Sequence, residues 1–193
     1  MWYKYEKEYF LEVRAKHPRD LSPLDIASRF IFLNRTCFNG MYRVNKKGGF
    51  NVPFGRYTNP KICDEDNLRN VSKLLQNVDI KLQGYEKILD NAKKGDFIYF
   101  DPPYYPLNKT SNFTTYNSDS FLEKEQKELR DVFFKLHKMG CFVMLSNSNT
   151  DFIKNLYSDL DTKIKITSVQ AGRSINSKAS SRGKISELVI TNY

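Results

Sequence analysis

Apolar runs that alternate with helical segments in the second half of the sequence restrict the fold more than any other feature. The runs DFIYF (96–100) and CFVMLSN (141–147) have the continuous apolar character of buried strands, and the segment 122–140 between them has the apolar spacing of a helix. Two further strands are predicted at 162–170 and 186–193, and they are candidates for an antiparallel pair at the C-terminal edge. The sequence therefore predicts an α/β sheet.

The first part of the chain follows a different pattern. One helix is predicted up to His17, and a second begins at Pro23 with Ser22 as its N-cap. The stretch NGMYRVNKKGGFNVPFGRY (39–57) comes next, where glycines supply the positive φ of a hairpin turn and Pro53 keeps the second arm at an edge. This part therefore predicts two helices followed by a basic, aromatic β-hairpin.

The middle of the sequence connects these two patterns. Its periodicity predicts a helix, a short strand and a short helix at 64–77, 78–83 and 84–92. We divide the chain into a helical and hairpin region, 1–76, and a sheet region, 77–193. We expect both regions to form one globular unit around one core, because the chain of 193 residues is too short for two full domains.

The cysteines argue against a disulfide framework and against a structural zinc site. Cys37, Cys63 and Cys141 are scattered and form no Cys-x-x-Cys pair. The N-terminal residues alternate charged and aromatic side chains, and no apolar run has the length of a signal peptide core or a membrane span. We expect a soluble, cytoplasmic protein that binds no metal.

The positive charge is concentrated near the N-terminus. The net charge is +9, and residues 1–60 hold eleven Lys and Arg against five Asp and Glu, which leaves +6 in that part. A concentrated charge favours a polyanionic partner such as nucleic acid, whereas lysines spread for solubility are the alternative.

The stretch IYFDPPYYP (98–106) carries the chemistry that the sequence predicts. Asp101 stands at the carboxyl end of a strand, where ligands of open α/β sheets bind. An exocyclic amine of a nucleobase is a poor nucleophile, because its lone pair is delocalised into the ring. Asp101 and the backbone carbonyl of Pro102 can each accept one hydrogen of such an amine, Pro102 and Pro103 fix the backbone, and Tyr104 can stack on the base. A turn without chemistry is the alternative.

At these residues the sequence resembles a known family. DPPY is the catalytic motif of amino-group methyltransferases that use S-adenosylmethionine, and RNA and cytosine N4 enzymes carry close variants. The stretches 32–57, 111–121 and 173–193 are similar to Dam-type DNA adenine N6-methyltransferases. The resemblance implies methyl transfer from S-adenosylmethionine to a flipped adenine, in the site GATC. It also implies an incomplete Rossmann-like methyltransferase sheet with an inserted helical and β-hairpin DNA-recognition region.

The resemblance assigns roles to individual residues of the two regions. Region 1–76 becomes the target-recognition region, and region 77–193 becomes the C-terminal part of the catalytic domain. Asp101 and the backbone near Phe100 are implied to contact the cofactor. The implied DNA contacts are Phe38 and Asn39 at the flipped base, Met41, Arg43 and Pro53 at base edges, Arg56 and Tyr57 at the backbone or flanking bases, and Lys46, Lys47 and Arg173 at phosphates.

Each of these roles has a structural alternative. We assign Phe50 and Phe54 mostly to the core, and Lys46 and Lys47 fit a solvated turn as well as a phosphate contact. The segment 107–120, with Phe113 and Tyr116, resembles the family segment that closes over the flipped adenine, and an ordinary surface loop is the alternative.

The sequence also departs from the family pattern. The family carries a Phe-x-Gly-x-Gly loop and an acidic residue for the ribose of S-adenosylmethionine, and neither precedes Asn39. We therefore expect this chain alone to be inactive. It is then either a truncated, catalytically inactive DNA-binding remnant, or one subunit of a split enzyme with a separate N-terminal cofactor-binding polypeptide. An rRNA amino-methyltransferase is a further alternative, which would not need the hairpin.

Overall fold

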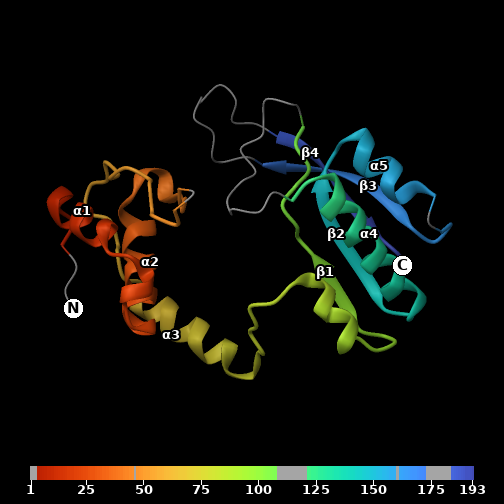
Figure 1. Cartoon of the computed structure of the whole chain (residues 1–193), viewed down its shortest axis with the longest axis horizontal. Helices are drawn as coiled ribbons and strands as arrows, with labels where there is room; N and C mark the ends of the chain where they lie inside the picture. Colours follow the sequence, from red (N-terminus) through yellow and green to blue (C-terminus); the bar gives the residue numbers. More distant parts are fainter. Residues whose placement is uncertain (1–3, 46, 108–120, 160, 173–183) are drawn as a thin grey trace. The chain divides into compact units, whose positions relative to one another are not determined.

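The chain folds into two compact units, residues Met1–Lys81 and Leu82–Tyr193. The structure is a computed structural model, and it describes residues 4–45, 47–107, 121–159, 161–172 and 184–193 (Figure 1). Each unit has its own buried apolar cluster. The expectation of a single core is therefore wrong, because each region buries its own apolar side chains. The observed division follows Lys81, a few residues later than the boundary we expected.

The described residues of the first unit form three α-helices and a hairpin. The helices are α1 (Lys7–Ala15), α2 (Pro23–Thr36) and α3 (Glu65–Leu74). Ser22 is the N-cap of α2, as predicted, and its Oγ accepts a hydrogen bond from the amide of Asp25 at 3.2 Å. The buried cluster combines Phe10 of α1, Phe32 of α2 and Phe50 of the hairpin. Packing of aromatic side chains thus fixes the hairpin onto the two helices.

The predicted hairpin is present, although its arms are not regular strands. Isolated antiparallel bridges join Cys37 to Phe54 and Val44 to Phe50. At the turn, the amide of Gly48 donates to the carbonyl of Asn45 at 2.8 Å, and Gly48 has a φ of 79°. A glycine therefore supplies the positive φ, as the sequence predicts.

The second unit contains a four-stranded mixed sheet. Its elements are β1 (Phe97–Phe100), α4 (Glu123–Lys138), β2 (Phe142–Ser148), α5 (Asp151–Ser158), β3 (Lys165–Gly172) and β4 (Lys184–Thr191). The strand order is β1-β2-β4-β3, with β1 parallel to β2 and with β4 antiparallel to both of its neighbours. The α/β class and the antiparallel pair at the edge are confirmed.

The two faces of this sheet differ in the described residues. Helices α4 and α5 cover one face (Figure 1), where Leu129, Leu145 and Ile190 belong to the buried cluster. The opposite face carries exposed aromatic side chains, since Phe97 is 59% and Tyr99 50% exposed. We call this side the open sheet face and define it by Phe97, Tyr99, Phe142, Val169 and Tyr193.

One predicted strand is absent. The segment 78–83 has no regular secondary structure, and Val78, Ile80 and Leu82 are all exposed. The alternation of apolar residues predicted a strand, but a strand needs a neighbour for its backbone hydrogen bonds. In the described part of the chain no strand pairs with this segment.

None of the described helices combines the length and the apolar character that crossing a membrane requires.

Candidate functional site

The loop after β1 places Asp101 where the sequence predicts a site. Asp101 directly follows Phe100, the last residue of β1, which pairs with Leu145 of the parallel strand β2, and the side chain of Asp101 is exposed. The side chain of Phe100 points the other way and is buried in the core of the second unit. Of Phe100, the backbone but not the side chain is thus available to a ligand at this strand end.

Tyr104 is held by a carboxylate that sequence reasoning missed. Its hydroxyl donates a hydrogen bond to Oε2 of Glu187 on β4, at 3.3 Å. Burial, together with the negative charges of Glu187 and Asp101, raises the pKa of Tyr104 to about 12. Tyr104 is therefore a neutral phenol at physiological pH. A single acid within the apolar run SELVITNY was the signal that could have identified Glu187.

Ser146 of β2 joins this polar group from the neighbouring strand. Its hydroxyl lies 2.9 Å from the hydroxyl of Tyr99, and it also hydrogen-bonds Tyr104. Tyr99, Ser146, Tyr104 and Glu187 therefore form a connected set of polar side chains beside Asp101. A ring stacked on a base here would be oriented by hydrogen bonds at its phenol end.

The neighbouring tyrosine has a different environment. The ring of Tyr105 stacks on Phe152 of α5 with centroids 4.4 Å apart, and its hydroxyl donates to Glu123 of α4. The side chain of Tyr105 thus packs against the helices α4 and α5. Of the two tyrosines in DPPYY, Tyr104 is the one beside Asp101 and Glu187.

Two buried amides hold the backbone of this loop. Nε2 of Gln126 donates to the carbonyl of Pro103 at 3.0 Å, and the amide of Tyr105 donates to Oδ1 of Asn147 at 3.0 Å. Neither Gln126 nor Asn147 is exposed at all. Sequence reasoning missed both, although a glutamine at a core-facing position of an amphipathic helix was a signal for Gln126.

In the first unit, Phe38 and Pro53 are adjacent. The amide of Phe38 donates to the carbonyl of Pro53 at 2.9 Å, and both side chains are exposed. Asn39 adopts a φ of 55°, and the side-chain amide of Asn34 holds the carbonyl of Gly40 at 2.6 Å. The turn after α2 therefore presents Phe38 and Asn39 to solvent on an anchored backbone.

Arg43 lies on the same hairpin arm with a fixed side-chain direction. Its Nε donates to Oδ1 of Asn51 at 2.8 Å, and the amide of Asn51 donates to the carbonyl of Arg43 at 3.0 Å. Among the described residues, the terminal amino groups of Arg43 have no hydrogen bond. They are free to contact a ligand.

The remaining residues that we predicted to contact DNA differ in how exposed they are. Arg56 and Lys47 are exposed, whereas Met41 is half-buried against the core of the first unit. The hydroxyl of Tyr57 donates to the carbonyl of Cys37 at 2.9 Å, so part of this side chain is structural. Lys46, Arg173 and most of segment 107–120, with Phe113 and Tyr116, lie outside the described residues.

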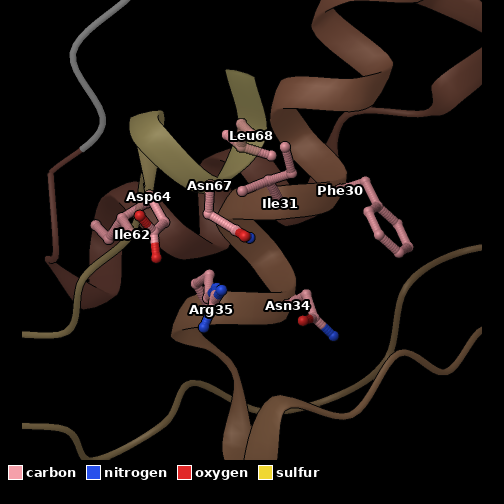
Figure 2. A pocket seen from close by; sticks show the side chains of 8 residues that line it. All are labelled: Phe30, Ile31, Asn34, Arg35, Ile62, Asp64, Asn67 and Leu68. Carbon is pink, nitrogen blue, oxygen red and sulfur yellow. The ribbon is translucent and has the colours of Figure 1, made fainter. Parts of the chain in front are cut away.

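The first unit also contains a small pocket between α2 and the start of α3 (Figure 2). Its volume is about 170 Å³. Sites for small molecules and cofactors usually hold about 300 Å³ or more. The pocket is therefore too small for a nucleoside cofactor. Its walls include apolar Phe30, Ile31 and Leu68 and polar Arg35, Asp64 and Asn67.

Among the described residues, no group of three or more His, Cys, Asp or Glu side chains is arranged to hold a metal ion.

Comparison with known proteins identifies similar sequences over nearly the whole chain. Residues 2–175 match the model of the D12 class N6 adenine-specific DNA methyltransferases. The chain is 45% identical over 194 residues to the type II methyltransferase M1.LlaDCHI of Lactococcus lactis, covering 97% of this chain and 66% of that protein. It is 49% identical over 192 residues to the type II methyltransferase M.MjaIII of Methanocaldococcus jannaschii, covering 97% and 65%.

A protein named DNA adenine methylase is also among the similar proteins. The chain is 33% identical over 182 residues to the DNA adenine methylase of Escherichia coli K12, covering 94% of this chain and 64% of that protein. The chain thus spans slightly less than two thirds of the length of each of these curated relatives.

Proposed function

The chain belongs to the family of D12 class N6 adenine-specific DNA methyltransferases, and from this membership we propose that it reads a DNA site and presents the amine of a flipped adenine for methylation. S-adenosylmethionine supplies the methyl group when it is bound. The observation that carries the proposal is the exposed carboxylate of Asp101 at the end of β1, beside the neutral, oriented phenol of Tyr104.

The site acts on the amine through hydrogen bonds. The lone pair of N6 of adenine is delocalised into the ring, so the nitrogen attacks poorly. Asp101 accepts one N6 hydrogen and the carbonyl of Pro102 accepts the other, which concentrates the lone pair on nitrogen. Tyr104 stacks on the base after it leaves the duplex. This chemistry requires neither a nucleophilic cysteine nor a metal.

The hairpin of the first unit supplies the DNA contacts. Arg43, held by Asn51, directs its free amino groups at guanine, whose O6 and N7 accept two hydrogen bonds. Half-buried Met41 offers apolar contact to a thymine methyl group. Phe38 and Asn39 lie at the flipped base, and Pro53, Arg56 and Tyr57 contact neighbouring groups. These residue types fit the site GATC in double-stranded DNA.

The residues of this chain do not complete a cofactor site. The sequence contains no Phe-x-Gly-x-Gly loop, and the strand end of β1 offers Asp101 and the backbone of Phe100. A nucleoside cofactor needs a strand-to-loop turn with close backbone approach. The sheet of the second unit therefore represents the C-terminal part of a Rossmann-like methyltransferase sheet, with the first unit as its recognition region. Within that arrangement, a separate cofactor-binding polypeptide or a DNA-binding remnant are the alternatives.

A chimera tests the function. The chain replaces the 192 matched residues of the Methanocaldococcus relative, and transfer of a labelled methyl group to GATC duplex is measured. Calorimetry with S-adenosylmethionine verifies that the chimera is folded and loaded. Methylation of adenine N6 that Asp101→Ala abolishes supports the proposal, because this carboxylate acts on the amine.

Two results contradict it. A loaded chimera that binds GATC duplex and methylates no adenine favours the DNA-binding remnant. A chimera that methylates rRNA in preference to duplex DNA favours the rRNA alternative.

A further inference from the structure

Two buried amide side chains, Gln126 of α4 and Asn147 of β2, contact the backbone on both sides of Tyr104. We propose that they are positioning residues that aim the carbonyl of Pro102 at the target amine. The inference rests on the proposed function, since it concerns the same reaction, but it assigns a role to residues outside the DPPY motif.

The four contacts of this pair form one chain of hydrogen bonds. Oδ1 of Asn147 accepts from the amides of Tyr105 and Ser148, at 3.0 and 2.8 Å. Nδ2 of Asn147 is therefore the donor to Oε1 of Gln126 at 3.0 Å. This leaves Nε2 of Gln126 to donate to the carbonyl of Pro103 at 3.0 Å. The backbone amides thus determine the orientation of both side chains.

The burial of this pair favours a positioning role over simple packing. Both side chains are completely buried. A buried amide without partners is costly, whereas Leu or Met would fill similar space without that cost. Two of the four hydrogen bonds of the pair are made to the backbone of Pro103 and Tyr105, which flank Tyr104. The groups that are fixed are therefore the backbone of the candidate site.

The hydrogen bond from Gln126 to Pro103 also affects the direction of the preceding carbonyl, that of Pro102. Asp101 and Pro102 each precede a proline, so both are restricted to extended backbone conformations. The direction of the Pro102 carbonyl relative to that of Pro103 depends on the dihedral angles of Pro103, whose φ is fixed by its ring. Because Gln126 holds the carbonyl of Pro103, it also limits the direction of the Pro102 carbonyl, which among the described residues has no hydrogen bond. It remains available beside the exposed carboxylate of Asp101.

The test uses the methylating chimera and a matched control on the same helix. Gln126→Leu removes the donor to Pro103, and Gln126→Met, closer in shape to glutamine, is the second variant in case the first does not fold. Val132→Ala removes buried methyl groups from the same helix and leaves the hydrogen bond from Gln126 to Pro103 in place. We expect the glutamine variants to lower kcat by about tenfold to a hundredfold, with KM for duplex changed by less than about threefold. Val132→Ala should lower only the melting temperature.

A spectroscopic measurement on the 193-residue chain separates positioning from stability. In the glutamine variants, NMR should show faster hydrogen exchange of the Tyr105 amide relative to that of Leu145 in β2, and a changed carbonyl ¹³C shift of Pro103. Unchanged exchange and shift, or an unchanged kcat in an active chimera, overturns the inference. A parent chimera that binds cofactor and duplex but methylates no adenine instead contradicts the proposed function, so the two failures are distinguishable.

Discussion

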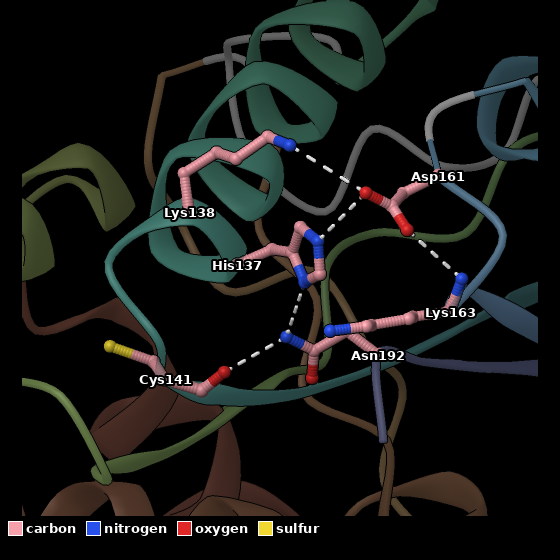
Figure 3. Close-up of polar contacts among 6 residues, drawn as sticks. All are labelled: His137, Lys138, Cys141, Asp161, Lys163 and Asn192. Atoms are coloured by element: carbon pink, nitrogen blue, oxygen red, sulfur yellow. Dashed lines mark hydrogen bonds and ion pairs between the residues drawn. The ribbon is translucent and has the colours of Figure 1, made fainter.

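The side-chain amide of Asn192 donates a hydrogen bond to Nδ1 of His137, 3.0 Å away (Figure 3). The same nitrogen donates to the carbonyl of Cys141 at 2.8 Å, and Oδ1 accepts the amide of Val143 at 2.7 Å. The orientation of the Asn192 amide is thus fixed, so Nδ1 of His137 is an acceptor and Nε2 carries the hydrogen. Nε2 lies 3.3 Å from Asp161, whose pKa is lowered by the amide of Lys163 and by His137.

Replacing Asn192 should destabilise the second unit. Asn192→Ala leaves the buried amide of Val143 and the carbonyl of Cys141 without partners, and we expect a loss of about 1–3 kcal/mol in the free energy of unfolding. Urea denaturation measures it. Asn155→Ala, at an exposed position of α5, is the matched control and should change stability little. Equal effects of both substitutions would show that the Asn192 network contributes nothing.

Tyr104 should ionise at a higher pH than an ordinary tyrosine. Its pKa is raised from 10.0 to about 12 by burial, then by Glu187 and Asp101. Glu187→Gln removes one negative charge, so the pKa should fall while remaining above 10.0. Titration of ¹³C-labelled tyrosine by NMR, assigned with Tyr104→Phe, measures both values. An ordinary pKa for Tyr104 in the unsubstituted chain would contradict the observed burial.

The same shift predicts the sign of a pH effect on stability. The folded chain holds the proton of Tyr104 more tightly than the unfolded chain does. The stability that the folded chain gains from protonated Tyr104 is therefore complete below pH 10.0 and is lost as the pH rises toward 12. In alkaline solution, Tyr104→Phe should lose less stability than the unsubstituted chain.

Arg43 and the lysines of the turn should differ in their effect on DNA binding. Arg43→Ala should weaken binding to a GATC duplex by about 1–3 kcal/mol and relax the preference at one guanine. Lys46→Ala or Lys47→Ala should weaken binding to all duplexes alike and reduce the salt slope by about one. Fluorescence anisotropy with cognate and scrambled duplexes at several salt concentrations distinguishes the two patterns. Sequence-independent losses for Arg43→Ala would remove its role as a base reader.

Gly55 should tolerate no side chain. A Cβ there would lie 2.8 Å from the carbonyl oxygen of Cys37 and 2.9 Å from that of Thr36, and it would also meet the ring of Tyr57. Backbone atoms cannot easily move aside, so Gly55→Ala should destabilise the first unit by about 1–3 kcal/mol. Thermal unfolding followed by NMR signals of both units measures the loss. Among the described residues, a Cβ at Gly172 meets no atom within 4 Å, so Gly172→Ala is the control.

Local signals in the sequence predicted local structure well. Ser22 before Pro23 predicted the start of α2, the glycines after Lys47 predicted the hairpin turn, and the apolar run before Asp101 predicted β1. Each signal depends on neighbours in the chain. The prediction failed for 78–83, because alternation cannot show whether a partner strand exists.

The residues that support the site could not be predicted from the sequence for a similar reason. Glu187 contacts Tyr104 across 83 positions of the chain, and Gln126 contacts Pro103 across 23. Neither spacing has a periodic signature. The division into two cores was likewise missed, because chain length alone does not show which apolar residues pack together.

The open sheet face has a consequence for how the chain behaves in solution. Tyr193 packs its ring edge-on against both Phe97 and Phe142, so these three rings form one aromatic surface rather than scattered side chains. Contiguous apolar surfaces adhere to one another, and sulfate strengthens this tendency because it is excluded from protein surfaces. The chain should therefore be retained on hydrophobic chromatography media, and its solubility should fall steeply as ammonium sulfate is added.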